Sequence, residues 1–126
     1  MLEPTLTAGE ALGAVRDRWP SARTDTEILN LLRACENTVR TEVLGLDGLA
    51  EPLAPETVLA VPSPYDGLYA HYAAALLAQM DGETARYNEE LALFYARWSD
   101  FTAARRRETL PDDRCAAGYA NRGVKR

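Results

Sequence analysis

This 126-residue sequence has few residues that could bind a metal ion or catalyse a reaction, and their spacing does not suit either role. Helical sites for two metal ions place Glu-x-x-His or acidic pairs three or four positions apart, because those side chains project into one site. Here the only acidic pairs four apart are Asp47/Glu51 and Glu108/Asp112, each near a proline, and no pair stands three apart. His71 is the only histidine, and we interpret it as a surface or helix-packing residue and not as a metal ligand.

The residues needed for nucleophilic catalysis or for phosphate binding are also missing from the sequence. A nucleophile needs a base beside it, yet His71 is the only histidine on offer and no Gly-x-Ser-x-Gly elbow occurs. The eight glycines are scattered and form no phosphate-binding loop. The adjacent carboxylates Glu89-Glu90 and Asp112-Asp113 are of a kind common on solvated faces. We therefore expect a protein that is not an enzyme and that uses no cofactor and no metal.

Charge is distributed unevenly along the chain. The formal net charge is -5, but residues 1–104 carry 7 arginines and 16 acidic residues, a balance of -9, while residues 105–126 balance at +4. An acidic body repels nucleic acid, and the region 25–44 is too acidic for a helix that reads DNA bases. The basic run Arg105, Arg106 and Arg107 suits either the C-terminus of a helix or docking on an acidic partner. Both interpretations stay open.

Composition indicates one globular domain, with 47% hydrophobic and 26% charged residues. No apolar run approaches the length that crosses a bilayer, and the first residues lack the pattern of a signal peptide, so we expect a cytosolic origin and no membrane partner. Cys35 and Cys115 match no metal spacing and are expected to be free thiols.

Hydrophobic periodicity predicts two helices in the first part of the chain. Apolar residues spaced three and four apart indicate a helix over residues 7–17, with Thr7 as its cap. A second helix over residues 25–44 opens with a capping box formed by Thr24 and Glu27. It is expected to end at Gly45 in a left-handed cap.

An extended segment is expected over residues 46–64. Its later part PLAPETVLAVPSP, residues 52–64, holds four of the seven prolines, which forbid a continuous helix. One alternative is a linker that lies on the helices of its own chain. The other is a strand that pairs with the edge of another copy. Under the second alternative, Val58, Leu59 and Val61 are candidates for contact between subunits.

Two further helices are predicted to form an antiparallel hairpin. They run from Tyr65 to Met80 and from about Glu83 to Arg107, and the turn between them is too short for another arrangement. Alanines in the first of these helices allow close approach. The predicted hairpin core consists of Tyr65, Tyr69, Tyr72, Leu76, Tyr87, Leu91, Phe94, Trp98 and Phe101. Tyr95 and Tyr119 lie off this stripe and are candidate contact residues.

The predicted fold class is therefore all-α: a small bundle of three to four helices with a long antiparallel hairpin, an extended Pro-rich segment and a C-terminal tail. The hydrophobic stripe spans only about two heptads, too few for a free coiled coil. We divide the chain into a helical domain over residues 1–110 and a basic tail over residues 111–126. Arg114 in the tail is a further contact candidate.

The stretches VPSPYDGLY and GETARYNEELALF resemble a family of tailed-phage head-tail connector (adaptor) proteins. In that family, an extended Pro-x-Pro-Tyr-Asp-x-x-Tyr segment leads into a helix, and a Gly-Glu-x-x-Arg-Tyr-Asn turn opens the next. The preceding ILNLLRACENTVRTEVLG is similar to the family's earlier helix, so the resemblance covers about residues 24–108 and is densest over 61–98. The matching positions are Pro62, Pro64, Tyr65, Asp66, Leu68, Tyr69, Gly82, Glu83, Arg86, Tyr87, Asn88, Ala92, Leu93 and Phe94.

The resemblance implies a virion protein without catalytic activity. Such proteins form a ring, usually of twelve copies, that docks under the portal protein, passes genomic DNA through its bore and offers a platform to downstream neck or tail proteins. Assembly takes place in the host cytoplasm, and the basic tail is expected to order on an acidic portal surface. The alternatives are another phage neck component, such as a head-completion or tail-joining protein, and a small cytosolic helical regulator that binds a partner helix.

Overall fold

The computed structural model describes residues 3–109, and every regular element in this range is a helix. The elements are α1 (Ala8–Arg18), α2 (Asp25–Glu42), α3 (Leu68–Met80) and α4 (Thr84–Thr109). The predicted all-α bundle is confirmed. The largest difference in boundary is at the start of α3, where residues 65–67 form turns and not helix.

Capping boxes begin the first two helices. The side-chain oxygen of Thr7 accepts from the backbone N–H of Glu10 at 3.1 Å, and the Glu10 carboxylate accepts from the backbone N–H of Thr7 at 2.9 Å. Thr24 and Glu27 repeat this arrangement at 3.2 and 2.9 Å. Both predicted caps are thus confirmed, and each satisfies backbone donors that a helix start leaves unpaired.

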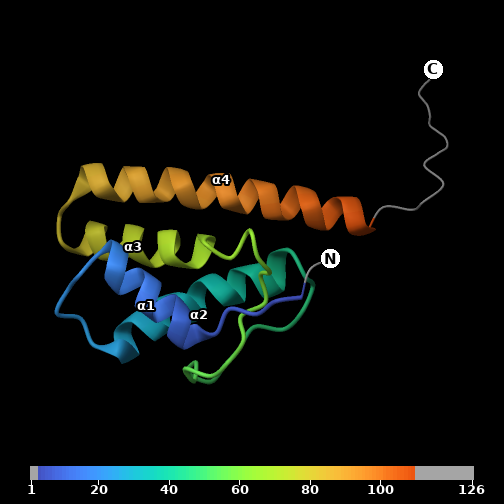
Figure 1. The fold of residues 1–126 in the computed structure, drawn as a ribbon, viewed down its shortest axis with the longest axis horizontal. Helices are drawn as coiled ribbons and strands as arrows, with labels where there is room; N and C mark the ends of the chain where they lie inside the picture. The colour runs from blue at the N-terminus through green and yellow to red at the C-terminus, as the bar shows by residue number, and fades with distance from the viewer. Residues whose placement is uncertain (1–2, 110–126) are drawn as a thin grey trace, which may run out of the picture.

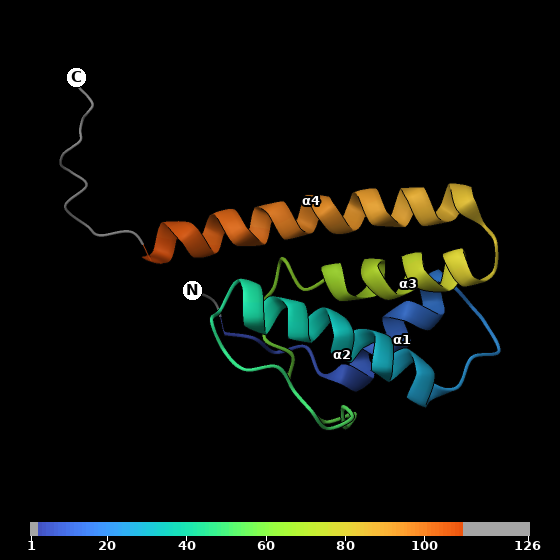
Figure 2. The same cartoon turned by 180° about the vertical axis from the view of Figure 1, so that it is seen from behind.

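Helix α3 is the central element of the bundle (Figure 1). It packs against α4 on one side and against α1 and α2 on the other, as the view from behind also shows (Figure 2). Gly82, whose φ of 77° lies in the left-handed region, makes the short turn that reverses the chain into α4. Helix α4 has 26 residues and α3 has 13, so the second half of α4 runs past the start of α3.

Small side chains allow α3 to lie between two layers. Ala73, Ala74, Ala75 and Ala78 are at most 1% exposed. Because alanine carries nothing beyond Cβ, the neighbouring helices approach the α3 backbone closely, as the sequence predicted. The α3 helix is buried on more than one side, which a single amphipathic stripe does not describe.

The aromatic packing between α3 and α4 is close to the prediction. The rings of Tyr72 and Phe94 lie 5.4 Å apart, centre to centre. The predicted core residues that are buried or pack against the buried core are Tyr65, Tyr69, Tyr72, Leu91, Phe94, Trp98 and Phe101. Leu76 and Tyr87 differ from the prediction, because they are half-buried and lie outside this core. The buried stripe of α3 includes Leu77 instead of Leu76.

Polar side chains of α2 hold the extended segment against the bundle. Arg33 and Arg40 donate to the backbone carbonyls at positions 50 and 47, each at 2.8 Å. The side-chain amide of Asn37 donates to the carbonyl of Leu49 at 3.1 Å and accepts from its N–H at 2.6 Å. Spacings of four and three put these three side chains on one face of α2.

The Val58 region pairs with the start of its own chain. Backbone hydrogen bonds of 2.8 Å join residues 57–59 to residues 6–8, and they form one isolated antiparallel bridge. Leu59 and Val61 are 0% exposed, while Val58 is 51% exposed. The linker alternative therefore describes this segment. The expectation that Leu59 and Val61 contact another subunit is wrong, because both side chains are buried in their own core.

A buried carboxylate fixes the place where the segment returns to α3. Glu36 is 2% exposed, and it accepts the O–H of Tyr69 at 2.6 Å and the N–H of Ala60 at 3.1 Å. The hydroxyl oxygen of Tyr69 in turn accepts from the N–H of Val61 at 3.0 Å. Burial, together with the nearby charge of Glu36, raises the pKa of Tyr69, so the phenol keeps the proton that it donates.

Replacing Tyr69 by Phe should destabilise the fold. The variant keeps the ring but leaves the carboxylate of Glu36 and the N–H of Val61 without their partner, and we expect the free energy of unfolding to fall by about 1–3 kcal/mol. Urea denaturation followed by circular dichroism measures this change. Tyr65→Phe is the matched control, because the Tyr65 hydroxyl makes no hydrogen bond within residues 3–109. Equal losses in the two variants would contradict the role given to the Glu36–Tyr69 bond.

Candidate interaction site

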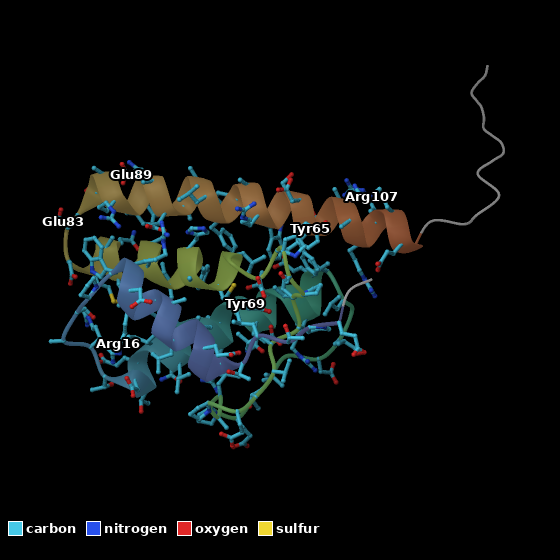
Figure 3. The ribbon with its side chains drawn as sticks, viewed as in Figure 1. Arg16, Tyr65, Tyr69, Glu83, Glu89 and Arg107 are labelled. Carbon is cyan, nitrogen blue, oxygen red and sulfur yellow. The ribbon has the colours of Figure 1, made fainter. Side chains whose placement is uncertain are left out.

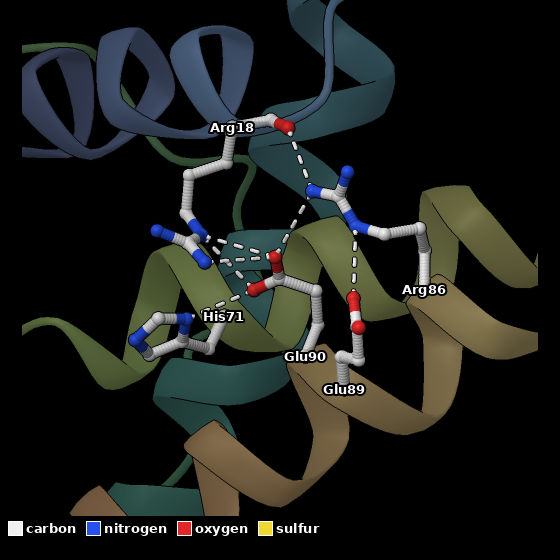
Figure 4. A network of polar contacts seen from close by, with 5 residues as sticks. All are labelled: Arg18, His71, Arg86, Glu89 and Glu90. Atoms are coloured by element: carbon white, nitrogen blue, oxygen red, sulfur yellow. Dashed lines mark hydrogen bonds and ion pairs between the residues drawn. The ribbon is translucent and has the colours of Figure 1, made fainter.

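Glu90 on α4 binds side chains from two other helices (Figure 4). Its carboxylate oxygens lie 2.9 Å from Nε and Nη2 of Arg18 on α1 and 2.9 Å from Nδ1 of His71 on α3. Arg86 lies 3.4 Å from the same carboxylate, donates to the carbonyl of Arg18 at 3.3 Å, and places Nε 3.5 Å from Glu89. We call these five residues the Glu90 cluster.

The Glu90 cluster is suited to holding helices together. Burial of Glu90 tends to raise its pKa, but the hydrogen bonds and charges of Arg18 and His71 outweigh burial, and the pKa is lowered below its ordinary value. The carboxylate is thus ionised, and a carboxylate in that state only accepts hydrogen bonds. Both of its oxygens are engaged, which favours a structural tie over proton transfer to a substrate.

Trp19, at the end of α1, binds residues on both sides of the turn between α3 and α4, beside this cluster. Nε1 of Trp19 donates to the carboxylate of Asp81 at 2.8 Å, and the guanidinium of Arg86 lies 5.2 Å from the centre of the Trp19 ring. The C-terminal end of α1 therefore contacts both sides of the α3–α4 turn. Within residues 3–109, no three His, Cys, Asp or Glu side chains come together as a metal site.

The prediction that Glu90 lies on a solvated face is wrong. The Glu90 side chain is 2% exposed and that of Glu89 is 68% exposed, and Glu89 lies on the outer face of α4 (Figure 3). Neighbours on a helix point in directions about 100° apart, so two adjacent acids need not share an environment. The one available signal was the spacing of four between Arg86 and Glu90, since Arg18 and His71 are distant in the sequence.

A groove lies along α4 from Phe94 to Arg106, between that helix and the C-terminal part of α2. It consists of two adjoining hollows of about 600 and 280 Å³ that share Glu42 and Trp98. Tyr72 and Cys35 contribute to the smaller hollow. We call this feature the α2–α4 groove and define it by Glu42, Phe94, Tyr95, Trp98, Thr102 and Arg105.

The groove combines aromatic walls with a charged end. The ring of Phe94 lies 5.4 Å from that of Tyr95 and 5.8 Å from that of Trp98. Tyr95 is 58% exposed, whereas Phe94 is 7% exposed. Aromatic rings that are partly open to solvent are typical of surfaces that bind other proteins, because covering them removes a large apolar area from water. Glu42 and Arg105 supply opposite charges beside these rings.

The predicted contact residues do not form one site. Tyr95 lies on the wall of the groove, and Arg105 and Arg106 line its larger hollow. Arg107 is exposed near the end of α4 (Figure 3), while Val58 lies on the extended segment. Arg114 and Tyr119 lie outside the described residues. The sequence located the aromatic residues of the groove, but it assigned Trp98 and Phe94 to the core alone.

Comparison with known proteins found no relative of this chain. No family model matches the chain, and neither a curated protein nor a solved structure matches it. The resemblance to phage connectors therefore remains a hypothesis carried by the matching residues of the sequence. Among residues 3–109, no helix has the length and apolar character required to cross a bilayer.

The Glu90 cluster should make stability depend on pH. Because the pKa of Glu90 is lower in the folded chain than its ordinary 4.5, its stabilising effect is complete above that value and is lost as the pH falls through the folded pKa. We expect Glu90→Gln to reduce the free energy of unfolding by about 1–3 kcal/mol at pH 7, with a smaller difference from the wild type at pH 3. Urea denaturation over this pH range measures both values.

The control for this prediction is Glu89→Gln, which removes an adjacent but exposed carboxylate with an ion pair of 3.5 Å to Arg86. Exposed ion pairs contribute little, so the loss should stay below about 1 kcal/mol at every pH. A difference between Glu90→Gln and the wild type that does not change with pH would show that the charge of Glu90 is not what the cluster uses.

Proposed function

We propose that the protein is a head-tail connector of a tailed phage, a virion structural protein that acts without catalysis. Identical subunits assemble in the host cytoplasm into a ring of the family's usual twelve copies under the portal protein of the head. The ring passes genomic DNA toward the neck and tail. The proposal begins from the resemblance over residues 24–108. The geometry of the hairpin supports it.

Several residues that match the connector family lie where the two helices of the hairpin are joined or held to the rest of the bundle. Gly82 makes the turn between α3 and α4, and Arg86 joins the Glu90 cluster four residues later. At the other end, the rings of Tyr65 and Phe101 lie 6.1 Å apart. Tyr69 makes the buried bond to Glu36. A motif that fixes the angle and the length of a hairpin is suited to a protein whose task is to hold a shape.

The single observation that carries the proposal is that the long helix α4 packs against α3 on one side and borders an open groove beyond it. Its first turns are fixed by the Glu90 cluster, while the part from Phe94 to Arg106 borders the α2–α4 groove, with Tyr95 largely exposed. Helix α3 is the only helix whose backbone packs closely along α4 within residues 3–109. A rigid helix with an open aromatic groove provides a surface for a neighbouring subunit or for the portal protein.

The charge of the chain fits passage of DNA. Residues 1–104 balance at -9, and an acidic wall repels phosphate groups, so a duplex slides through a channel instead of binding to it. The part of the chain with a net positive charge begins at Arg105, at the end of α4 that borders the groove. This separation of charge allows one surface to face DNA and another to bind an acidic protein partner, such as the portal protein or a downstream neck protein.

The second candidate function is a small helical regulator that binds a partner helix. The α2–α4 groove favours it, because helices dock in grooves lined by apolar and aromatic side chains. The two functions differ in assembly state. A connector joins a portal ring and is present in the virion, whereas a regulator of this kind stays a monomer that ignores the portal.

The connector function is tested with the portal protein encoded in the same genome. We expect electron microscopy of the mixture to show this chain as a ring against the portal, and mass spectrometry to find it in purified particles. Tyr95→Ala should weaken portal or ring binding about tenfold or more, as expected for loss of a central aromatic contact, with the monomer still folded. Light scattering and sedimentation measure the binding.

Leu93→Ala is the matched control, since Leu93 is also exposed on α4, at 44%, but does not line the groove. It should leave binding nearly unchanged. A chain that stays monomeric beside the portal and is missing from particles would overturn the connector function. Equal effects of the two variants would instead move the contact surface away from the groove.

A further inference from the structure

The α2–α4 groove ends close to where the described chain ends. Arg105 and Arg106 line its larger hollow, and α4 finishes at Thr109. Seventeen further residues, 110–126, follow from this point. The first segment able to reach the groove is thus part of the same chain.

The length of this segment fits the groove. From Arg106 back to Tyr95, α4 rises about 16 Å at the usual 1.5 Å per residue. Pro111, Asp112 and Asp113 are residues that favour a reversal of the chain. The six residues from Asp113 to Tyr119 then span about 20 Å when extended, which brings Tyr119 level with Tyr95.

The chemistry of the segment also fits. The smaller hollow is lined by Phe94, Tyr95 and Trp98, and an aromatic residue such as Tyr119 is of a type that packs well against such rings. Ala116, Ala117 and Gly118 are small enough to pass along a narrow channel. Arg114 comes before them and has the charge opposite to that of Glu42, the acidic residue shared by both hollows. Charged, small and aromatic residues therefore occur in the order in which the groove would receive them.

We propose that residues 110–119 fold back into the α2–α4 groove of their own chain and place Tyr119 against Tyr95 and Trp98. A short tether gives the segment an effective concentration of about 1 mM, so it occupies the groove before a second copy does in dilute solution. The consequence for assembly rests on the proposed function: a free subunit has its contact surface covered, and a neighbour or the portal must displace the segment.

A spin label on Cys115 tests this directly in the full chain. Cys35 is 1% exposed, and burial raises the pKa of its thiol, so the reagent reacts with Cys115 selectively. We expect the label to reduce the NMR signals of Thr38, Glu42 and the Trp98 indole several-fold. The signals of Arg86 and Glu90, at the far end of α4, should keep their intensity.

Two controls separate the possible occupants. When ¹⁵N-labelled chains without the spin label are mixed with spin-labelled chains of natural isotope content, the groove signals should keep their intensity, because the contact is within one chain. Tyr119→Ala in the spin-labelled chain should restore most of the signal. This variant lies outside the described helices and leaves the buried core unchanged.

Three results would overturn the proposal: groove signals that keep their intensity in the labelled chain, signal loss that occurs only in the mixed sample, and signal loss that persists in Tyr119→Ala. The second result would assign the groove to the segment of another copy. All of these measurements use the isolated chain without portal protein. Failure of the connector function would leave them unchanged, so the two hypotheses fail separately.

Discussion

The bundle depends on the burial of α3 between two layers. Its alanines bring α4 close on one side and α1 and α2 close on the other. A larger side chain at Ala73 or Ala74 would have to displace a whole helix, because well-packed interiors have little spare volume. The position of α4, and with it the shape of the α2–α4 groove, is therefore set by residues that never touch the groove.

Two buried carboxylates complete this arrangement in different ways. Glu36 binds neutral donors, the phenol of Tyr69 and a backbone N–H, and it fixes the returning segment. Glu90 binds Arg18 and His71, and it fixes the first turns of α4. Both oxygens of each carboxylate accept hydrogen bonds, which is what makes a buried charge tolerable. One end of α4 is thereby fixed, while the other borders an open surface.

The sequence predicted the helices well because their signals are local. Capping residues, apolar spacing and the Gly82 turn act within a few positions of each other, and the structure follows them. The ties between distant segments could not be predicted in the same way, since Arg18 and Glu90 are 72 positions apart. Glu36 gave a partial signal, because it stands on the apolar stripe between Leu32 and Val39, where a charged residue needs a buried partner. The groove could not be predicted, because it lies between α2 and α4, which are far apart in the sequence.

The way α2 holds the extended segment has a consequence for how the sequence can change. Arg33, Asn37 and Arg40 bind carbonyl and amide groups of the main chain, which every amino acid but proline supplies alike. The exposed positions 47 and 50 are thus free to drift in evolution without losing their place, while the three side chains that hold the stretch are under constraint. Gly48 is constrained too, because a Cβ there would lie 3.3 Å from the side chain of Asn37. Related genes would be expected to diverge fastest at positions 47 and 50, although the path of the main chain there is among the most firmly determined.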